Sequence, residues 1–241
     1  MQNNFNYEVI NFMSRVKDSN DIVTPGEVVV DGNDFYTDSG VYEENGKIYS
    51  KYFGTVRYGD NSVQVRPMHG RYIPEEGDII IGEITRVSYS RWTVEFNSPY
   101  EGSLNIADAT DEYVDLDEDD LTDFFAVGDA VAIKVKSVTE GMDVDMSMED
   151  DRCKKLEGGR VIEIPPSKVP RVIGKGGKMI KQVNNKTGCN IIVGQNGQVW
   201  IKGDNANLAA RTIHKIVEES QFDNLTDRIG EFLDEELEGD N

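Results

Sequence analysis

The sequence is poor in the residues that cross-link a fold, bind a metal or carry out catalysis. Two cysteines, Cys153 and Cys189, cannot stabilise a chain of 241 residues by a disulfide framework or complete a zinc site by themselves. The two histidines, His69 and His214, have no partner at the spacing of metal ligands. No apolar run approaches the roughly 18 residues that a membrane span needs, and the first twenty residues lack the apolar core of a secretory signal. We therefore expect a cytoplasmic protein with no cofactor, no metal site and no membrane partner.

Positive charge is scarce overall but concentrated in one segment. Residues 1–151 contain 11 basic and 32 acidic side chains, and residues 218–241 contain 1 and 10. Residues 152–217 reverse this balance, with 13 basic and 3 acidic side chains. Exposed charges more than about 8–10 Å apart are largely screened at physiological salt. The local excess of positive charge can therefore bind a polyanion, although the whole chain has a net charge of −20.

Short β-forming runs and turn residues predict two β units after a loosely held segment, residues 1–21, which could also order on a partner. The first unit, residues 22–72, contains runs separated by turns such as Asn45-Gly46. The second, residues 73–151, has five runs with a long connection before the fourth, which fits a five-stranded barrel of the OB type. That connection includes residues 108–123, with nine acidic and no basic side chains. We interpret it as a solvated loop with a helical turn.

The third unit, residues 152–217, alternates between strand and helix patterns in the order β-α-α-β-β-α. Residues 218–241 follow as an acidic tail that should oppose the binding of a polyanion. The tail could fold back as an intramolecular competitor, but we favour a disordered solubilising segment. The predicted fold class is therefore mainly β, with one α+β domain at the C-terminal side.

A G-x-x-G motif between two predicted helices is the strongest candidate site. Glycine allows close approach of a ligand to the backbone, and helix N-termini offer N–H groups to phosphate oxygens. Basic side chains crowd the same place and favour a polyanion. A second G-x-x-G, at residues 194–197, joins two strands and is best explained as a hairpin turn. The candidate RNA-binding residues are Arg171, Gly174, Lys175, Gly176, Gly177, Lys178 and Lys181.

The stretch V-I-G-K-G-G-K-M-I at residues 172–180, within the β-α-α-β-β-α order, resembles a type I KH domain. The resemblance implies binding of about four nucleotides of single-stranded nucleic acid over the G-x-x-G loop. It also implies a groove floored by residues such as Ile180, Ile191 and Val193.

Residues 76–84, 127–131 and 143–148 of the second unit resemble an S1 RNA-binding domain. In that family, bases stack on aromatic residues of the second and third strands, and Trp92 occupies the first of these positions. Leu104-Asn105 stands where the second aromatic is common, so we expect contacts chiefly from basic side chains. Lys134 and Lys136 alternate with apolar residues and thus share the outer face of one strand. The candidate RNA-binding residues on this barrel are Arg91, Trp92, Lys134 and Lys136.

The domain order and the joining stretch V-R-P-M-H-G-R-Y-I-P at residues 65–74 resemble the ribosomal RNA-processing protein four family, the RNA-binding cap subunits of the archaeal exosome. The resemblance implies a non-catalytic subunit that binds single-stranded RNA and guides it into a hexameric ring of phosphorolytic, RNase PH-like subunits for 3′-to-5′ degradation. Three copies would form the cap, alone or mixed with another exosome cap subunit.

The first β unit carries more aromatic side chains than so small a domain easily buries, and its many acidic residues repel phosphate. We therefore expect this unit to contact the ring, with Phe35, Tyr36 and Tyr42 available for an interface and Phe53 in the domain's own core.

Three other functions remain open from the sequence. A transcription elongation factor can also join S1 and KH domains, but with the type II KH order. A phosphorolytic exoribonuclease places KH before S1 and needs large catalytic domains upstream, which a 72-residue segment cannot hold. A free-standing RNA-binding regulator that caps no ring is opposed only by the family resemblance.

Overall fold

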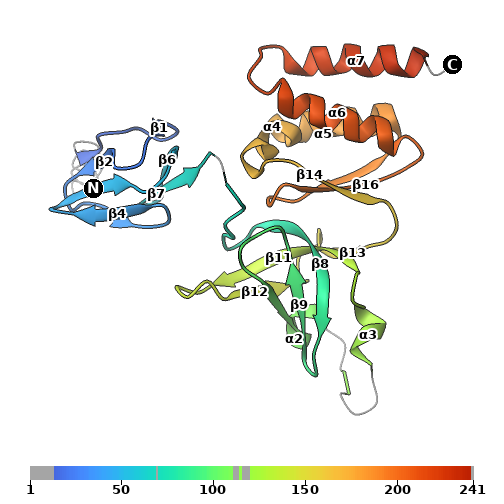
Figure 1. The fold of residues 1–241 in the computed structure, drawn as a ribbon, viewed down its shortest axis with the longest axis horizontal. Coiled ribbons are helices and arrows are strands. Elements are labelled where there is room, and N and C mark those ends of the chain that lie inside the picture. Colours follow the sequence, from blue (N-terminus) through green and yellow to red (C-terminus); the bar gives the residue numbers. More distant parts are fainter. Residues whose placement is uncertain (1–13, 69, 111–113, 116–119, 240–241) are drawn as a thin grey trace, which may run out of the picture. The chain divides into compact units, whose positions relative to one another are not determined.

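The computed structural model describes residues 14–68, 70–110, 114–115 and 120–239 of the chain (Figure 1). The chain divides into two compact units, one ending at Gly70 and the other beginning at Arg71. In the described part of the chain, no helix is long and apolar enough to cross a membrane.

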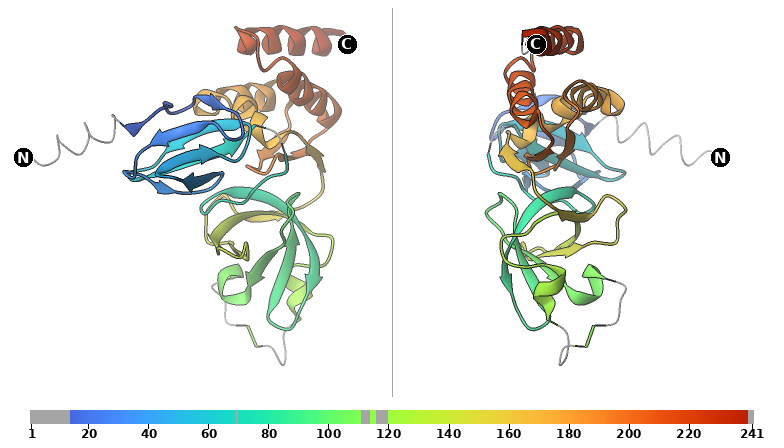
Figure 2. Two further views of the ribbon diagram at one scale, coloured as in Figure 1. Left: turned by 60° about the vertical axis from the view of Figure 1, so that its left-hand side comes forward. Right: turned by 90° about the vertical axis from the view of Figure 1, so that its right-hand side faces the viewer.

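The N-terminal unit consists of two small β-sheets around one apolar core. Its strands are β1 (Ile22–Val23), β2 (Val28–Asp31), β3 (Tyr36–Thr37), β4 (Val41–Glu44), β5 (Lys47–Ser50), β6 (Gly54–Tyr58) and β7 (Ser62–Pro67). One sheet has the order β1-β6-β7-β3 and the other β2-β5-β4 (Figure 2, blue strands). Asn45 and Gly46 have positive φ angles of 52° and 73° and form the predicted tight turn between β4 and β5. The predicted all-β unit is confirmed.

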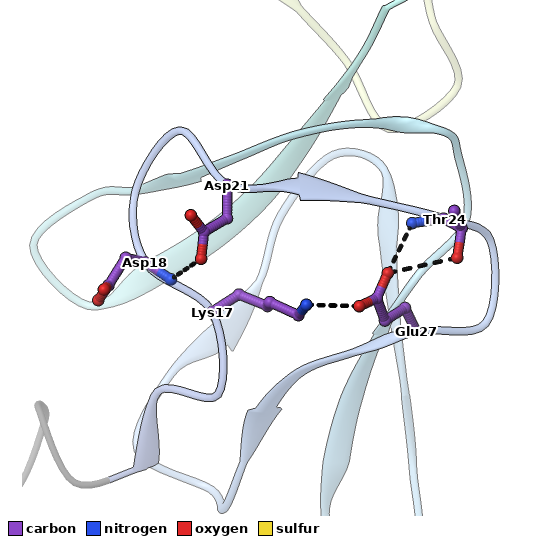
Figure 3. A network of polar contacts seen from close by, with 5 residues as sticks. All are labelled: Lys17, Asp18, Asp21, Thr24 and Glu27. Carbon is purple, nitrogen blue, oxygen red and sulfur yellow. Dashed lines mark hydrogen bonds and ion pairs between the residues drawn. The ribbon is translucent and has the colours of Figure 1, made fainter.

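The segment from Ser14 to Asn20 is attached to this unit, although its sequence predicts a loosely held segment. The backbone N–H of Val16 donates to Val29 O at 3.0 Å. The Arg15 guanidinium lies 4.2 Å from the centre of the Tyr58 ring. Lys17 forms an ion pair with Glu27 at 2.5 Å (Figure 3), which lowers the pKa of the Glu27 carboxyl. The earlier part of the predicted flexible segment, residues 1–13, lies outside the described residues.

The second unit begins with the predicted five-stranded barrel. Its strands are β8 (Ile79–Val87), β9 (Arg91–Glu95), β10 (Gly102–Asn105), β11 (Ala130–Val138) and β12 (Val144–Ser147). β8 pairs with β9 and β11, β9 with β10, and β12 closes the barrel between β10 and β11. The β10–β12 pair is parallel and the others are antiparallel, which is the topology of an OB-type barrel. Tyr72 is buried in this core, so the barrel's packing begins before residue 73.

Two short helices, α2 (Ile106–Ala109) and α3 (Leu121–Phe124), flank the acidic connection of the barrel. Asp120 accepts a hydrogen bond from the backbone N–H of Thr122 and caps α3. Leu121 and Phe125 are buried in the barrel core. The predicted solvated loop therefore has ends that are packed against the barrel; residues 111–113 and 116–119 within it lie outside the described part of the chain.

The C-terminal part of the second unit has a three-stranded antiparallel sheet covered by helices, in the predicted β-α-α-β-β-α order. After β13 (Lys154–Leu156), which pairs with β11, its elements are β14 (Arg160–Glu163), η1 (Pro166–Lys168), α4 (Val169–Ile173), η2 (Lys175–Gly177), α5 (Lys178–Thr187), β15 (Asn190–Val193), β16 (Gln198–Lys202) and α6 (Ala206–Glu218). The sheet order is β14-β16-β15. The predicted fold class, mainly β with an α+β domain, is confirmed.

A further helix, α7 (Leu225–Gly239), lies beside α6 (Figures 1 and 2). Its residues Leu225, Ile229 and Leu233 are buried in the same core as α5 and α6. The expectation of a disordered acidic tail is therefore wrong for this segment, because an apolar stripe with a spacing of four residues anchors it as a helix.

The barrel and the α+β domain pack directly on each other through the turn at residues 194–197. The Asn196 side chain is fully buried, accepts a hydrogen bond from Ile81 N at 3.2 Å and donates to Ile81 O and Phe96 O at 2.7 and 2.8 Å. Ile81, Leu156 and Trp200 form a small apolar cluster across the same junction. The second G-x-x-G is the predicted hairpin turn, and it also fixes the two domains of this unit to each other.

Candidate nucleic-acid interface

Three glycines shape the turn between α4 and α5. Gly174, Gly176 and Gly177 have φ angles of 73°, 63° and 74°, a region that side chains other than glycine rarely occupy. A Cβ atom on Gly174 would lie 2.6 Å from the Cβ of Met179, so this position excludes any side chain. A Cβ atom on Gly176 would meet nothing within 4 Å, so space remains open on that side of the loop. The turn therefore presents bare backbone to solvent between two helices.

Four basic side chains surround this turn. Arg171 is on α4, Lys175 is in the turn, and Lys178 and Lys181 are one helical turn apart at the start of α5, so they share a face. All four are exposed. Lys181 extends back toward the loop, since a Cβ on Gly177 would lie 3.7 Å from its Cε. The structure thus brings together the seven residues that the sequence predicted for this site.

The basic residues around the turn differ from the other basic residues of the domain in their partners. Among the residues that the structure describes, none of the four forms an ion pair. Elsewhere in the domain, every basic side chain except the exposed Lys154 bonds to an acidic group or a neutral oxygen; these are Arg152, Lys155, Arg160, Lys168, Lys186, Lys202, Arg211 and Lys215. Positive charge is therefore available to a ligand mainly at the glycine turn.

The three apolar residues predicted to floor a groove differ in exposure. Ile180 and Val193 are half-buried and pack against the core of the domain, while Ile191 is only 7% exposed. Ile191 therefore belongs to the core, whereas Ile180 and Val193 keep part of their side chains accessible. Half-buried apolar residues next to unpaired positive charge suit a ligand with both bases and phosphates.

On the barrel, the structure excludes Trp92 as a stacking residue. Its indole is 0% exposed and its Nε1 donates to Phe125 O at 2.9 Å. The rings of Phe124 and Phe125 pack against it edge-on. The prediction of a base-stacking role for Trp92 is wrong because the chain that returns from the acidic connection covers the ring. No local sequence signal gives that contact, which joins residues more than thirty positions apart.

The three basic residues predicted on the barrel have different surroundings. Lys136 forms an ion pair with Asp108, and Lys134 is half-buried near Asp150. Arg91 is exposed at the start of β9 and forms no ion pair with a residue that the structure describes. The structure therefore does not bring Lys134, Lys136 and Arg91 together as one basic surface.

Two features of this unit were missed by sequence reasoning. The first is the junction residue Asn196, which sequence reasoning treated only as part of a turn motif. A polar residue between two glycines could have indicated a contact of that turn with another domain. Arg86 and Tyr89, which precede Arg91 in the hairpin between β8 and β9, are exposed. Within the described ranges, no group of three or more His, Cys, Asp and Glu side chains is arranged to hold a metal ion.

Comparison with known families and proteins gives a consistent result. Residues 159–220 match a family model described as KH domain, and residues 71–137 match one described as RRP4, S1 domain. Exosome complex component Rrp4 of Thermococcus kodakarensis is 42% identical over 218 residues, covering 88% of this chain and 84% of that protein. The same component of Methanothermus fervidus is 38% identical over 220 residues, covering 90% and 97%.

Among solved structures, a protein assigned as an exosome complex RNA-binding protein matches with a TM-score of 0.65 and 32% identity, covering 71% of this chain and 100% of that one. The two domain models, the shared order of domains and the identity over nine-tenths of the chain agree with one another. The chain belongs to the family of the exosome complex component Rrp4.

Proposed function

We propose that this protein is a non-catalytic cap subunit of an exosome, which binds single-stranded RNA at the glycine turn of its KH domain and delivers it to a ring of phosphorolytic RNase PH-like subunits. The observation that carries the proposal is the contrast in ion pairing. The basic side chains at the turn are exposed and without acidic partners among the described residues, while most others in the domain are engaged. Since the substrate is cellular RNA, we expect the complex to work in the cytoplasm.

Several features of the site support binding of RNA rather than of a small anion. The turn offers positive charge on three successive segments, α4, the loop and the start of α5, which suits a chain of phosphates. The half-buried Ile180 and Val193 beside it offer apolar surface to bases. The hydrogen bonds of Asn196 join the S1 barrel to this domain, which supports the proposal that one RNA strand contacts both domains.

The experiment that tests the proposal is binding of a fluorescent single-stranded RNA to the full chain at several salt concentrations. Replacing Lys175→Asp and Gly176→Asp together should weaken binding strongly. Gly176 is the suitable position for this change, because a side chain there has free space and aspartate tolerates a positive φ better than most residues. The same substitution at Gly174 would collide with Met179 and unfold the loop.

A matched control places an equal change of charge away from the turn. Lys154→Asp with Gln195→Asp alters two exposed positions and changes the net charge by the same amount. This control should bind RNA nearly as well as the unaltered chain. Equal loss in both variants would show that only the net charge matters, and unchanged binding by the turn variant with a native circular dichroism spectrum would overturn the proposal.

The N-terminal unit is the part that we assign to the ring. Tyr36 is 76% exposed, and Tyr42, Tyr52 and Phe53 are also exposed, whereas Phe35 is buried in the core. The expectations that Phe53 belongs to the core and that Phe35 is available for an interface are therefore both wrong. Aromatic residues are enriched at the cores of protein interfaces. These residues belong to an acidic unit, so a protein partner suits them better than RNA.

Deletion of residues 1–70 should abolish co-elution with the ring while leaving RNA binding nearly intact. The cut falls at Gly70 because Tyr72 is part of the barrel core and donates from its hydroxyl to Asp78 at 2.6 Å. Co-elution of the truncated chain at full stoichiometry would contradict this assignment. The isolated full chain should also show no ribonuclease activity, with or without phosphate or divalent metal; phosphorolysis by carefully purified protein would overturn the non-catalytic role.

A further inference from the structure

The hairpin that joins β8 and β9 ends in a tight turn with an exposed aromatic residue. Ser88 N donates to Arg91 O at 2.8 Å, so residues 88–91 form the turn. Tyr89 sits within it and is 71% exposed. In the part of the chain that the structure describes, no hydrogen bond or ring contact holds the Tyr89 side chain. The ring is therefore available to a ligand, in contrast to the buried Trp92 three residues later.

Two arginines lie on the outer face of the same hairpin. Trp92 and Val94 point into the barrel core, so the alternating residues Arg91 and Thr93 point outward. Arg86 pairs with Thr93 across the hairpin and therefore shares that outer face. Opposite and diagonal neighbours in a sheet lie within about 8 Å of each other. The Cβ atoms of Arg86 and Arg91 are thus within about 8 Å of each other, and both residues lie beside the turn.

The charge of the barrel is concentrated at this end of the hairpin. Residues 73–151 contain four basic side chains, of which Lys136 is paired with Asp108 and Lys134 is half-buried near Asp150. Arg86 and Arg91 are exposed and form no ion pair with a described residue. Glu83 and Glu95 pair farther along the same two strands, and Glu95 is a diagonal neighbour of Arg86. Arg91 lies four residues, about 13 Å, from Glu95 along β9, so at physiological salt the charge of Arg91 is largely screened from this glutamate.

We propose that the β8–β9 hairpin tip is a second contact for single-stranded RNA, in which a base stacks on Tyr89 and Arg86 and Arg91 bind the flanking phosphates. The loop between the first two strands of an OB-type barrel is one of the places where this architecture presents a ligand surface. An exposed ring accepts any base on its face, and unpaired guanidinium groups bind phosphate. The inference rests on the proposed RNA-binding function and extends it to a place on the barrel that the sequence assigned to Trp92.

A protein partner is the competing occupant of this tip. A barrel with only four basic residues among many acidic ones repels a polyanion everywhere except where positive charge is unpaired. The tip is such a place, and its aromatic ring stands between the two arginines in the sequence. The combination of an exposed ring and two arginines favours single-stranded RNA, which offers both bases and phosphates. An acidic protein surface would bind the arginines but would leave the ring without a specific role.

The test measures binding of the full chain to a fluorescent oligouridylate, together with ultraviolet cross-linking of the same RNA carrying 4-thiouridine. Tyr89→Leu keeps an apolar side chain but removes the stacking face, and it should weaken binding about tenfold. Tyr89→Phe should bind as the unaltered chain does. Phe222→Leu, at an exposed aromatic residue between α6 and α7, is the matched control and should have no effect. Cross-links should include Tyr89.

A second measurement tests the arginines. Arg86→Gln with Arg91→Gln should reduce the slope of log affinity against log salt by about 1.4, as expected for two lost phosphate contacts on a single strand. Unchanged affinity for Tyr89→Leu, together with an unchanged salt slope for the arginine variant, would overturn the inference. Loss of co-elution with the ring by these variants, with RNA binding intact, would overturn it too and identify a protein contact.

The variant with Lys175→Asp and Gly176→Asp separates this inference from the proposed function of the KH turn. If that variant loses affinity for RNA and the hairpin variants do not, the inference fails while the assignment of the KH turn stands. If the hairpin variants lose RNA and the KH variant does not, the assignment of the KH turn fails while the hairpin contact stands.

Discussion

The two ends of helix α5 carry the same type of side chain in opposite surroundings. At its first turn, Lys178 and Lys181 are exposed and form no ion pair with a described residue. In its last turn, Lys186 donates to Asp234 at 2.6 Å and to Gly230 O at 2.9 Å, both on α7. Positive charge at one end is thus open to RNA, and at the other end it is bound to the acidic helix.

The comparison shows how a protein with a net charge of −20 keeps a local site for a polyanion. Helix α7 engages basic residues of α5 and α6, since it also pairs with Arg211 through Glu236 at 2.6 Å. Lys215 lies 4.8 Å from the centre of the Phe232 ring of the same helix. These contacts remove positive charge from the face covered by α7. The glycine turn is then the main remaining place with unpaired cations on this domain, and it is where we propose that RNA binds.

The largest expected effect concerns the packing that holds α7 in place. Leu233 is fully buried between α7 and the rest of the domain. Leu233→Ala should lower the free energy of unfolding by about 2–5 kcal/mol, because it removes buried apolar surface and leaves a cavity. Chemical unfolding followed by tryptophan fluorescence measures this, since both tryptophans lie in the second unit.

The matched control for this change is Glu231→Ala, on the exposed side of the same helix. A surface substitution of this kind should change the free energy of unfolding by less than about 0.5 kcal/mol. Equal, small effects of both substitutions would mean that α7 is not part of the folded domain in solution, and the comparison of the two ends of α5 would lose its basis.

The docking of α7 shows which parts of the fold the sequence could predict. The glycine turn and the strand runs are local patterns, so residue types alone were sufficient to place them. Helix α7 was also accessible in principle, because Leu225, Ile229 and Leu233 have helical spacing. The ten acidic residues around that stripe led instead to the prediction of a disordered tail.

The errors at the barrel have a different physical origin. Trp92 is buried by Phe124 and Phe125, which approach it only after a connection of about thirty residues. Lys136 is engaged by Asp108 from a different element. Likewise, the contact of Asn196 with Phe96 joins residues a hundred positions apart. Burial and pairing of this kind depend on tertiary structure, so residue type and alternation indicate the face of a strand but not what covers it.

The second prediction compares the two ends of α5 directly. Lys181→Glu should weaken RNA binding several-fold and reduce the salt slope by about one contact, because this side chain extends over the glycine turn. Lys186→Glu changes the charge equally but alters a residue already bound to α7, so RNA binding should stay within about twofold. Fluorescence anisotropy at several salt concentrations checks both. Equal losses would show that RNA contacts the whole length of α5.

The third prediction concerns the exposed acidic charge of α7. Asp234→Lys with Glu236→Lys releases Lys186 and Arg211 and adds two positive charges. Affinity for RNA should rise a few-fold at low salt, and the gain should shrink as salt screens the added charges. The neutral pair Asp234→Asn and Glu236→Gln should give a smaller gain. An affinity at low salt equal to that of the unaltered chain would show that the charge of α7 does not reach the bound RNA.

The smallest expected effect is the direct energy of the ion pair between Lys186 and Asp234. The two side chains are 28% and 62% exposed, so water screens most of their attraction. A double-mutant cycle with Lys186→Met and Asp234→Asn should give a coupling of about 0.2–1 kcal/mol in the free energy of unfolding. A coupling above about 2 kcal/mol would mean that charge pairing, rather than the apolar stripe, docks α7. In that case high salt should release the helix and expose the basic residues of α5 and α6, and RNA binding would spread from the glycine turn to the face that α7 now covers.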